Sequence, residues 1–561
     1  MKKLRWQILV VVLTLIVVVV LLLTQQPTQS PIVPEPVSGG IYTEALIGSF
    51  GRLNPLLDLN NPADRDIDRL LFSSLIKFDS RGVPQPDLAE SWGVSADGTI
   101  YNVTLRANAV WQDGTPITSD DVLFTTSLLR SEYSAYSADV RSMWDQVEIT
   151  RLDDKNIKFI LPEPFVPFLD FLTFGILPEH LLETVSADQL SKTEFNLAPV
   201  GSGPYKFDHL TVESGQITGV VLTKSENYYD QVPFVDQIVF RYYPSADAAL
   251  AAYKQGEVLG ISQMPANSIA ATCADPNLSC YSSRMPQLAI VLFNLGNNDV
   301  PFFQDKQIRR ALMTGLNRQW MVDYLLQGQA VVADSPLLPL SWAYYDGVEH
   351  IGFDPDTAKN ELKAAGYVLP PDGIVRAKDT ISFSFTMVYP DDAIHAQLAQ
   401  TIQQNWADIG VEVKLQAVSY DSLIKDHLTP RTYQAALVDL DLSRSYDPDP
   451  YPFWHQAEIN GGQNYSQWDN RTASEYLEQA RVVADPNIRA RLYRNFQVVF
   501  TRELPALPLY YPIYTYGVDQ RVQGVQAVPL FEPADRFNGI ASWYLVTRRT
   551  LEQTVPPTVV P

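Results

Sequence analysis

The stretch Leu88–Phe124 reads LAESWGVSADGTIYNVTLRANAVWQDGTPITSDDVLF and carries the clearest structural pattern in the chain. Apolar and polar residues alternate over Tyr101–Leu105, which predicts a half-buried strand. Asp97-Gly98 precedes this strand and Asp113-Gly114 follows it. Both pairs favour turns, because Gly tolerates a positive φ and the Asp side chain bonds its own backbone. The stretch therefore predicts strands, tight turns and, at its end, the start of a helix.

Helices and strands alternate in the same way farther along the chain. Thr118–Asp121 is a capping box that predicts a helix over Val122–Leu129. Similar patterns predict a helix over Ile308–Leu316, a helix that begins at Asp354-Pro355 and ends at Gly366, a helix with Ile394, Leu398, Ile402 and Trp406 on one stripe that ends at Gly410, and a strand over Val411–Val418. Such helix–strand units fit layers of helix on sheet, the α/β class.

The length and charge of the chain limit what it can be. A chain of 561 residues is too long for one core, so several domains are expected. Hydrophobic residues make up 46% of it, which is enough for sizeable cores. With 42 basic and 64 acidic residues, the net charge is -22. Nucleic acid is not expected as a partner, because an acidic chain repels phosphate.

The first residues indicate export. Lys2, Lys3 and Arg5 precede the apolar run Ile8–Leu23, as in a signal segment. Neither a small-x-small cleavage site nor a lipid-acceptor Cys follows this run. The run approaches the roughly 17–25 residues that a spanning helix needs. We therefore expect residues 1–25 to be an uncleaved transmembrane signal anchor, with a cleaved signal peptide as the alternative. The rest of the chain is expected in the periplasm or on the outer face of the cytoplasmic membrane.

Three further segments have distinctive compositions. Residues 26–39 are proline-rich and predict an extended linker between the membrane and the first domain. Residues 551–561 are rich in Pro and Val without periodicity and predict a disordered tail. Cys273 and Cys280 are the two cysteines of the chain, in CADPNLSC. In an exported chain such a close pair favours a disulfide, and two buried free thiols are the alternative.

The sequence carries none of the common catalytic or metal-binding patterns. The chain has no G-x-S-x-G elbow, zinc H-E-x-x-H pair, phosphate-binding G-x-x-x-x-G-K-[ST] loop or G-x-G-x-x-G turn. Its six histidines are isolated and show no ligand spacing. We therefore expect no enzyme activity, no cofactor and no metal site.

The richest polar and aromatic cluster is Asp439–Trp454, DLDLSRSYDPDPYPFW, which follows the apolar strand Ala435–Val438. Aromatic side chains with a few converging polar groups are typical of ligand pockets. Asp441, Tyr446, Asp447 and Trp454 are therefore candidate ligand-binding residues. The alternative is a capped helix with packed aromatic side chains.

The opening stretch resembles the signature of family 5 of the bacterial solute-binding proteins, the oligopeptide- and dipeptide-binding receptors of ABC importers. Other segments resemble family blocks in the same order: Pro199–Phe207, Ala251–Val258, Leu292–Arg318, Asp354–Tyr367, Ile402–Leu415, Asn464–Leu477 and Leu504–Pro512. Together they cover nearly the whole chain from about Gly40 to Tyr544.

The resemblance implies a two-lobed periplasmic-binding-protein-like (type II) α/β fold with an extra inserted domain. Mapped on this chain, it gives lobe 1 as residues 40–77, 199–286 and 518–550, the inserted domain as residues 78–198, and lobe 2 as residues 287–517.

The resemblance also implies a ligand held between the lobes. An Asp in the loop after Val438 is expected to pair with the α-amine of a peptide, and Asp441 and Asp447 both fit part of that pattern. Phe50, Asn54 and Asn294 align with family segments near the hinge and cleft, with a surface loop and a strand end as the alternative interpretations.

The expected function is therefore that of a monomeric peptide receptor that delivers its ligand to the permease subunits of an ABC importer. A sensory receptor on the same fold, an extracytoplasmic hydrolase, and a binder of a nickel complex, haem, sugar or opine remain alternatives.

Overall fold

The computed structural model describes residues 6, 11–19, 32–79, 81–339, 341–443 and 446–551. Residues 11–19 are helical and exposed. Within the described ranges, no helix has both the length and the apolar character needed to cross a membrane. Most of the predicted signal anchor, the first half of the predicted linker and nearly all of the predicted tail lie outside the described residues.

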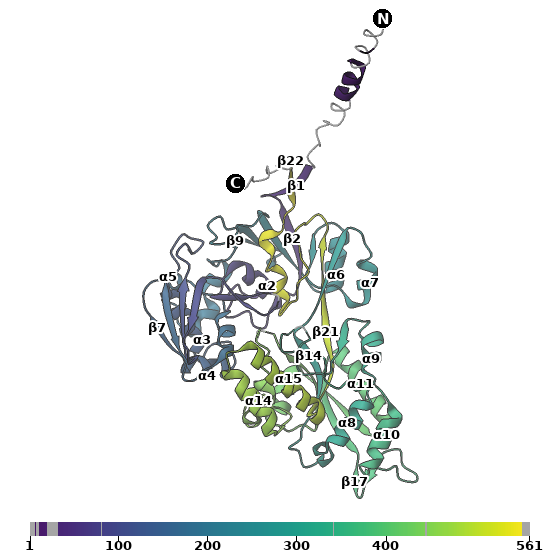
Figure 1. Ribbon diagram of the computed structural model, residues 1–561. Coiled ribbons are helices and arrows are strands. Elements are labelled where there is room, and N and C mark those ends of the chain that lie inside the picture. The colour runs from purple at the N-terminus through teal and green to yellow at the C-terminus, as the bar shows by residue number, and fades with distance from the viewer. Residues whose placement is uncertain are drawn as a thin grey trace.

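The second half of the predicted linker pairs with the end of the chain. Strand β1 (Ile32–Val37) runs antiparallel to β22 (Val546–Leu551), with Ile32 opposite Leu551 and Val37 opposite Val546. Pro34 and Pro36 are compatible with β1 because, in the part of the chain that the structure describes, this ribbon has two strands and β1 is an edge strand. Both segments lie side by side at one end of the molecule (Figure 1).

A twelve-stranded mixed sheet extends through both lobes and is the largest sheet among the described residues. Its main path runs through β19 (Glu412–Val418), β18 (Ser384–Pro390), β20 (Ala435–Asp441), β14 (Gln287–Phe293), β21 (Ala506–Asp519), β12 (Gly260–Ile261), β2 (Ile41–Ile47), β11 (Gln237–Tyr243), β10 (Gln216–Lys224) and β9 (Tyr205–Glu213), and β13 (Leu278–Arg284) and β15 (Ala330–Val332) also pair with β21. The mixed sheet with helices packed on it agrees with the predicted α/β class.

Strand β21 belongs to both lobes. Its first half pairs with β14 and β15 of lobe 2, and its second half pairs with β12 and β13 of lobe 1. Figure 1 shows this long strand running from one lobe into the other. A second connection passes from β13 to β14 through Arg284–Gln287. The lobes are therefore joined through two neighbouring segments, the arrangement of a hinge.

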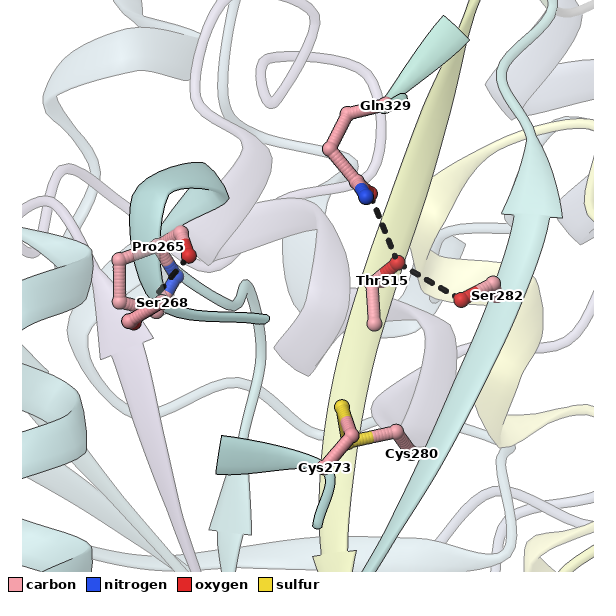
Figure 2. Close-up of a disulfide and its surroundings, with 7 residues drawn as sticks. All are labelled: Pro265, Ser268, Cys273, Cys280, Ser282, Gln329 and Thr515. Carbon is pink, nitrogen blue, oxygen red and sulfur yellow. Dashed lines mark hydrogen bonds between the residues drawn. A yellow bond between two sulfur atoms is a disulfide. The ribbon is translucent and has the colours of Figure 1, made fainter. Parts of the chain in front are cut away.

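Thr515 lies where the two lobes meet on β21. Its hydroxyl is 2.8 Å from the Ser282 hydroxyl of β13 and 3.5 Å from Gln329 Oε1 of lobe 2 (Figure 2). Beside it, the Ile513 N–H donates to the Gln329 carbonyl at 2.9 Å. The predicted boundary at residue 517 therefore falls within a strand that both lobes share, and the domain boundaries stay predictions.

The inserted domain contains the stretch that opened the sequence analysis. Its sheet has the order β5 (Ala89–Val94), β6 (Ile100–Leu105), β8 (Asn156–Ile160) and β7 (Glu148–Arg151). The predicted strand is thus confirmed as β6. The predicted capping box is confirmed at Thr118 and Asp121, and it begins α3 (Ser119–Arg130).

One hydrophobic core joins the inserted domain to lobe 1. Trp111, Trp144 and Phe168 of the inserted domain belong to the same buried cluster as Tyr42 and Ile67 of lobe 1. The remaining elements of these two parts are α2 (Pro62–Leu71), β3 (Ile76–Phe78), β4 (Pro84–Pro86), α4 (Ala138–Gln146), α5 (Glu179–Leu182), α6 (Ala246–Lys254), α7 (Ile269–Thr272), and the 3₁₀ helices η1 (Val166–Leu172), η2 (Ala187–Lys192), η3 (Glu194–Leu197), η4 (Ala266–Ser268), η9 (Pro533–Phe537) and η10 (Ile540–Ser542). Their shared core makes the inserted domain and lobe 1 one packing unit.

The part of the sheet that lies in lobe 2 is buried on both faces. Along β14, Ala289, Val291 and Phe293 belong to one core cluster, while the alternate residues Leu288 and Ile290 belong to another. The α-helices of this lobe are α8 (Lys306–Thr314), α9 (Arg318–Trp320), α10 (Pro355–Ala364), α11 (Ala393–Asp408), α12 (Tyr420–Ser422), α13 (Tyr451–Trp454), α14 (Arg471–Val482) and α15 (Pro486–Glu503). They are joined by the 3₁₀ helices η5 (Pro301–Gln304) and η8 (Gln456–Ile459), the π-helices η6 (Met321–Leu325) and η7 (Leu423–Leu428), and the small hairpin β16 (Ala377–Lys378) and β17 (Ile381–Ser382). Elements α8, α10, α11 and β19 confirm the helices and the strand predicted for this region.

Cys273 and Cys280 form a disulfide in the structure, with Cα atoms 5.7 Å apart (Figure 2). Cys273 follows α7, and Cys280 lies on β13 opposite Gly517 of β21. The bridge therefore fixes a short loop of lobe 1 beside the strand that joins the lobes.

Candidate functional site

A cavity of about 680 Å³ lies where lobe 1, the inserted domain and one loop of lobe 2 meet. Lobe 1 contributes α2, the loops beside it and the segment Phe531–Ser542. The inserted domain contributes side chains from α3, α4 and η1, and lobe 2 contributes Tyr446. The volume falls within the roughly 300–1,000 Å³ of small-ligand sites.

Aromatic rings form much of the cavity wall. The lining aromatic residues are Phe72, Tyr136, Trp144, Phe171, Phe174, Tyr228, Tyr446, Phe531 and Phe537. Several of them are fixed by neighbours; Trp144, for example, meets Phe174 edge to face at 5.6 Å. Rigid rings of this kind give a ligand apolar contact area at little entropic cost.

Helix α2 supplies the charged side chains. Asn61 caps its N-terminus through the N–H groups of Ala63 and Asp64, and Pro62 occupies the first turn. Arg65, Asp68 and Arg69 are three and four residues apart and therefore lie on one side of the helix. All three line the cavity.

The two arginines of α2 already have carboxylate partners. Arg65 lies 3.5 Å from Glu532 and 3.7 Å from Asp58. Arg69 forms an ion pair with Glu532 and lies 3.3 Å from Asp535. The pairs with Glu532 and Asp535 connect α2 to the N-terminal end of η9. They therefore fix one wall of the cavity and place charged groups on it.

Asp68 differs from its neighbours. It is 2% exposed, and neither carboxylate oxygen has a hydrogen-bond partner among the described residues. Burial raises the pKa of Asp68 well above its usual range, and the nearby Asp58 and Asp64 carboxylates add to the shift. An unpaired carboxyl group therefore lines the cavity.

Tyr446 is the predicted site residue that the structure places in the cavity. Its ring stacks on Phe78 at 4.4 Å and meets Phe531 at 4.7 Å. Its hydroxyl donates to Asp535 Oδ1 at 3.3 Å, and burial raises the pKa of Tyr446. A lobe 2 side chain thus packs between the inserted domain and lobe 1.

The structure gives Asp447 partners within the protein. Its carboxylate lies 2.6 Å from Arg489 of α15, and its N–H donates to Asp170 of the inserted domain at 2.7 Å. Burial raises the pKa of Asp447, while the charge and hydrogen bond of Arg489 act in the opposite direction. Asp441 lies at the exposed end of β20 and accepts the Ser443 N–H at 2.9 Å. Neither carboxylate lines the cavity.

Trp454, Asn54, Asn294 and Phe50 also lie away from the cavity lining. Trp454 is in the lobe 2 core, edge to face with Phe500. Asn54 bonds Asn196 and the Leu56 N–H, and Asn294 donates to the carbonyls of Arg431 and Tyr433. Phe50 is half-buried against the lobe 1 core. Packed aromatic side chains and a strand end describe Trp454 and Asn294, whereas Asn54 is fully buried and does not fit the surface-loop alternative. Direct ligand contact by these residues stays a prediction.

Helix α2 and Phe531–Ser542 were not predicted from the sequence as parts of the site. One signal was present in the sequence: Asp64, Asp68 and Leu71 fall on one stripe of the helix, which places acidic residues on its buried face. No comparable sequence pattern connects α2 with Glu532, because that contact joins residues far apart in the chain.

Comparisons with known proteins agree with the resemblance. The family model for bacterial extracellular solute-binding proteins, family 5 (middle), matches residues 83–463. The oligopeptide-binding protein AppA of Bacillus subtilis is 28% identical over 520 residues, which cover 91% of this chain and 92% of AppA.

Two solved structures show the same fold. The AppA structure from Bacillus subtilis in complex with a nonapeptide has a TM-score of 0.71 at 27% identity and covers 91% of this chain and 100% of its own. NikZ from Campylobacter jejuni in complex with Ni(L-His) has a TM-score of 0.70 at 25% identity and covers 90% and 99%.

Proposed function

The chain belongs to family 5 of the bacterial extracellular solute-binding proteins, and from this premise we propose that it binds a peptide at the lobe junction and delivers it to an ABC importer. The likeness to AppA, bound to a nonapeptide in its solved structure and matched over nearly the whole of both chains, is the observation that carries the proposal. The aromatic cavity supports it, because peptides offer both apolar side chains and charged ends.

Ligand capture involves closure of the two lobes. The shared strand β21 and the neighbouring connection Arg284–Gln287 are the hinge, and Tyr446 is the lobe 2 side chain that reaches the opposite wall. A ligand that contacts both walls shifts the population towards the closed form. The permease then distinguishes closed from open receptor.

Binding without catalysis is part of the proposal. It is supported by the relatives, which are named as binding proteins. The proposed receptor is monomeric and needs no cofactor, and Asp441 or Asp447 remains a predicted partner for a ligand amine.

The proposal includes attachment to the membrane through residues 1–25. Lys2, Lys3 and Arg5 before an apolar run support this, together with the extracellular character of the family. The intact mass of protein extracted from membranes tests it: the full mass is expected, and an N-terminus between Thr24 and Gly40 contradicts anchoring.

Native mass spectrometry of the full chain in mild detergent tests the function itself. We expect co-purified peptides, and calorimetry with a synthetic copy should give a saturable isotherm. A co-purified nickel chelate with no peptide would instead favour a ligand like the Ni(L-His) in the NikZ complex. Turnover of the peptide during the measurement would contradict binding without catalysis.

A further inference from the structure

The charges around the cavity are unequal. Asp58, Asp68, Asp87, Asp170, Asp230 and Glu532 line it, against the basic side chains Arg65, Arg69 and Lys77. Each basic side chain already lies within ion-pair distance of carboxylates: Arg65 and Arg69 as described above, and Lys77 at 3.9 Å from Asp87 and 3.6 Å from Asp230. The lining therefore has more negative than positive groups, and no described basic side chain is paired with Asp68.

Asp68 is the buried member of this set without a hydrogen-bond partner. The carboxylates of Asp58 and Asp64 raise the pKa of Asp68 and the Asn54 N–H and Arg65 lower it, so these four groups lie near the Asp68 carboxyl group. The Tyr242 hydroxyl is close enough for Asp68 to raise the pKa of Tyr242, and it too has no hydrogen-bond partner among the described residues. A buried carboxyl group with no donor is costly for the folded protein.

We propose that Asp68 is a cation subsite, which receives an ammonium or guanidinium group of the ligand in the cavity beside α2. The aromatic wall then receives the apolar part of the same ligand. A cationic donor supplies both the charge and the hydrogen bonds that the carboxylate lacks. The ligand's identity as a peptide rests on the proposed function, whereas the preference for a cation rests on Asp68 alone.

The position of this subsite explains how a cation can be selected without Asp441 or Asp447. Asp447 is neutralised by Arg489, and Asp441 is exposed to water. A carboxylate exposed to water gains little from a ligand cation, because screening is strong there. Asp68 is shielded from solvent, so the same pairing is stronger at its position.

The test uses two probes of matched shape, phenethylammonium chloride and 2-phenylethanol, with the full chain in detergent at constant ionic strength. The readout is the shift in Tm. The variants are Asp68→Asn and the matched control Asp230→Asn, which removes an equal charge from the same lining but at a half-exposed position.

We expect phenethylammonium to raise the Tm of the wild type and of Asp230→Asn, and to leave Asp68→Asn unchanged. The alcohol should have little effect on any of the three. Equal shifts with both probes in the wild type overturn the proposal, and this result needs no variant to fold. Equal shifts in the wild type and Asp68→Asn, or a loss in Asp230→Asn as large as in Asp68→Asn, overturn it as well.

A second experiment tests cation binding at Asp68 and peptide binding by the protein independently of each other. Tetrapeptide pools with free or acetylated N-termini, each with and without lysine, are compared by native mass spectrometry. Asp68→Asn should lose a preference of about tenfold or more for the cationic pools while retaining neutral peptides. The pool preferred by the wild type shows whether the ammonium comes from the N-terminus or from lysine. If no peptide binds but the amine probe does, the peptide function fails and the cation subsite stands.

Discussion

Asp447 and Arg489 form a buried ion pair in which each side chain is about one-tenth exposed or less. Removing one partner of such a pair leaves the other charge buried and uncompensated. We therefore expect Asp447→Asn to lower the free energy of unfolding by about 3–5 kcal/mol. Urea denaturation measures this value.

Asp441→Asn is the matched control for that prediction. It makes the same chemical change at an exposed strand end, so a change within about 0.5 kcal/mol is expected. Equal stabilities of the two variants would mean that the pair with Arg489 contributes nothing. Loss of peptide affinity in Asp441→Asn without loss of stability would support the predicted amine contact of Asp441.

Asp68 should also make stability depend on pH. Burial and the carboxylates of Asp58 and Asp64 raise the pKa of Asp68, against the weaker opposing effects of the Asn54 N–H and Arg65. The folded chain therefore holds this proton more tightly than the unfolded chain does. The resulting stabilisation is complete below the unfolded pKa, about 3.9, and is lost as pH rises through the raised folded pKa.

Asp68→Asn removes that dependence. Relative to wild type, its free energy of unfolding should rise as pH increases from about 4 to the folded pKa of Asp68 and then level off. Urea denaturation at a series of pH values measures the difference between the two proteins. A difference that stays constant with pH would show that the pKa of Asp68 is the same in the folded and unfolded chains.

At the scale of single elements, local signals in the sequence predicted structure well. Thr118 and Asp121 form the predicted capping box, and Asp354 caps α10 through the N–H groups of Asp356 and Thr357. These interactions join residues a few positions apart, so their chemistry is visible in the sequence.

Interactions between distant segments were not predictable in this way. Strand β1 pairs with β22, and Arg65 of α2 lies within ion-pair distance of Glu532. The sequence near β1 and near Arg65 does not indicate these partners. The composition of the loop after Val438 predicted four ligand-binding residues. Of these four, only Tyr446 lines the cavity. Composition identifies groups that suit a pocket, whereas tertiary packing decides which of them face it.

The disulfide beside β13 should stabilise the chain by limiting its unfolded state. For a loop this short, the chain-entropy model gives about 2–3 kcal/mol, although the origin of the effect is model-dependent. The double variant Cys273→Ser/Cys280→Ser should lower the free energy of unfolding by that amount, as measured with urea under non-reducing conditions. The wild type should show no titratable thiol when denatured without reductant.

Ser268→Ala serves as the control for the disulfide variant. Its hydroxyl donates only to the nearby Pro265 carbonyl at 3.3 Å (Figure 2), so a change within about 0.5 kcal/mol is expected. If the double cysteine variant is as stable as Ser268→Ala, the loop is held by its backbone pairing with β21 and not by the bridge.

At the scale of the whole molecule, the lobes share strand β21, and apart from this strand Tyr446 is the lobe 2 side chain described in the lobe 1 core cluster. Residues of β14 and β20 belong to the lobe 2 clusters, whereas the lobe 1 cluster extends into the inserted domain. Relative motion of the lobes at the hinge therefore has to withdraw Tyr446 from the lobe 1 cluster, while the lobe 2 clusters stay intact. The contacts of Tyr446 with Phe78 and Phe531 are among those that such a motion has to break.

Tyr446→Ala should consequently favour the open form. Two aromatic contacts and a hydrogen bond to Asp535 are lost, which should weaken closure by about 1–2 kcal/mol and ligand affinity by roughly five- to thirtyfold. Small-angle scattering should give a larger radius of gyration for the ligand-free variant than for the wild type. Saturating ligand should reduce the radius of both proteins, because the ligand also contacts both walls.

Tyr324→Ala distinguishes closure from the general loss of an aromatic side chain. Tyr324 is an exposed lobe 2 tyrosine that stacks on Trp320 at 5.7 Å, within its own lobe. Its removal should change neither the radius of gyration nor the affinity. If Tyr446→Ala loses affinity while its ligand-free scattering curve matches that of the wild type, Tyr446 acts as a ligand contact in the cavity and not through closure. If saturating ligand leaves the curves of all three proteins unchanged, binding takes place without hinge motion.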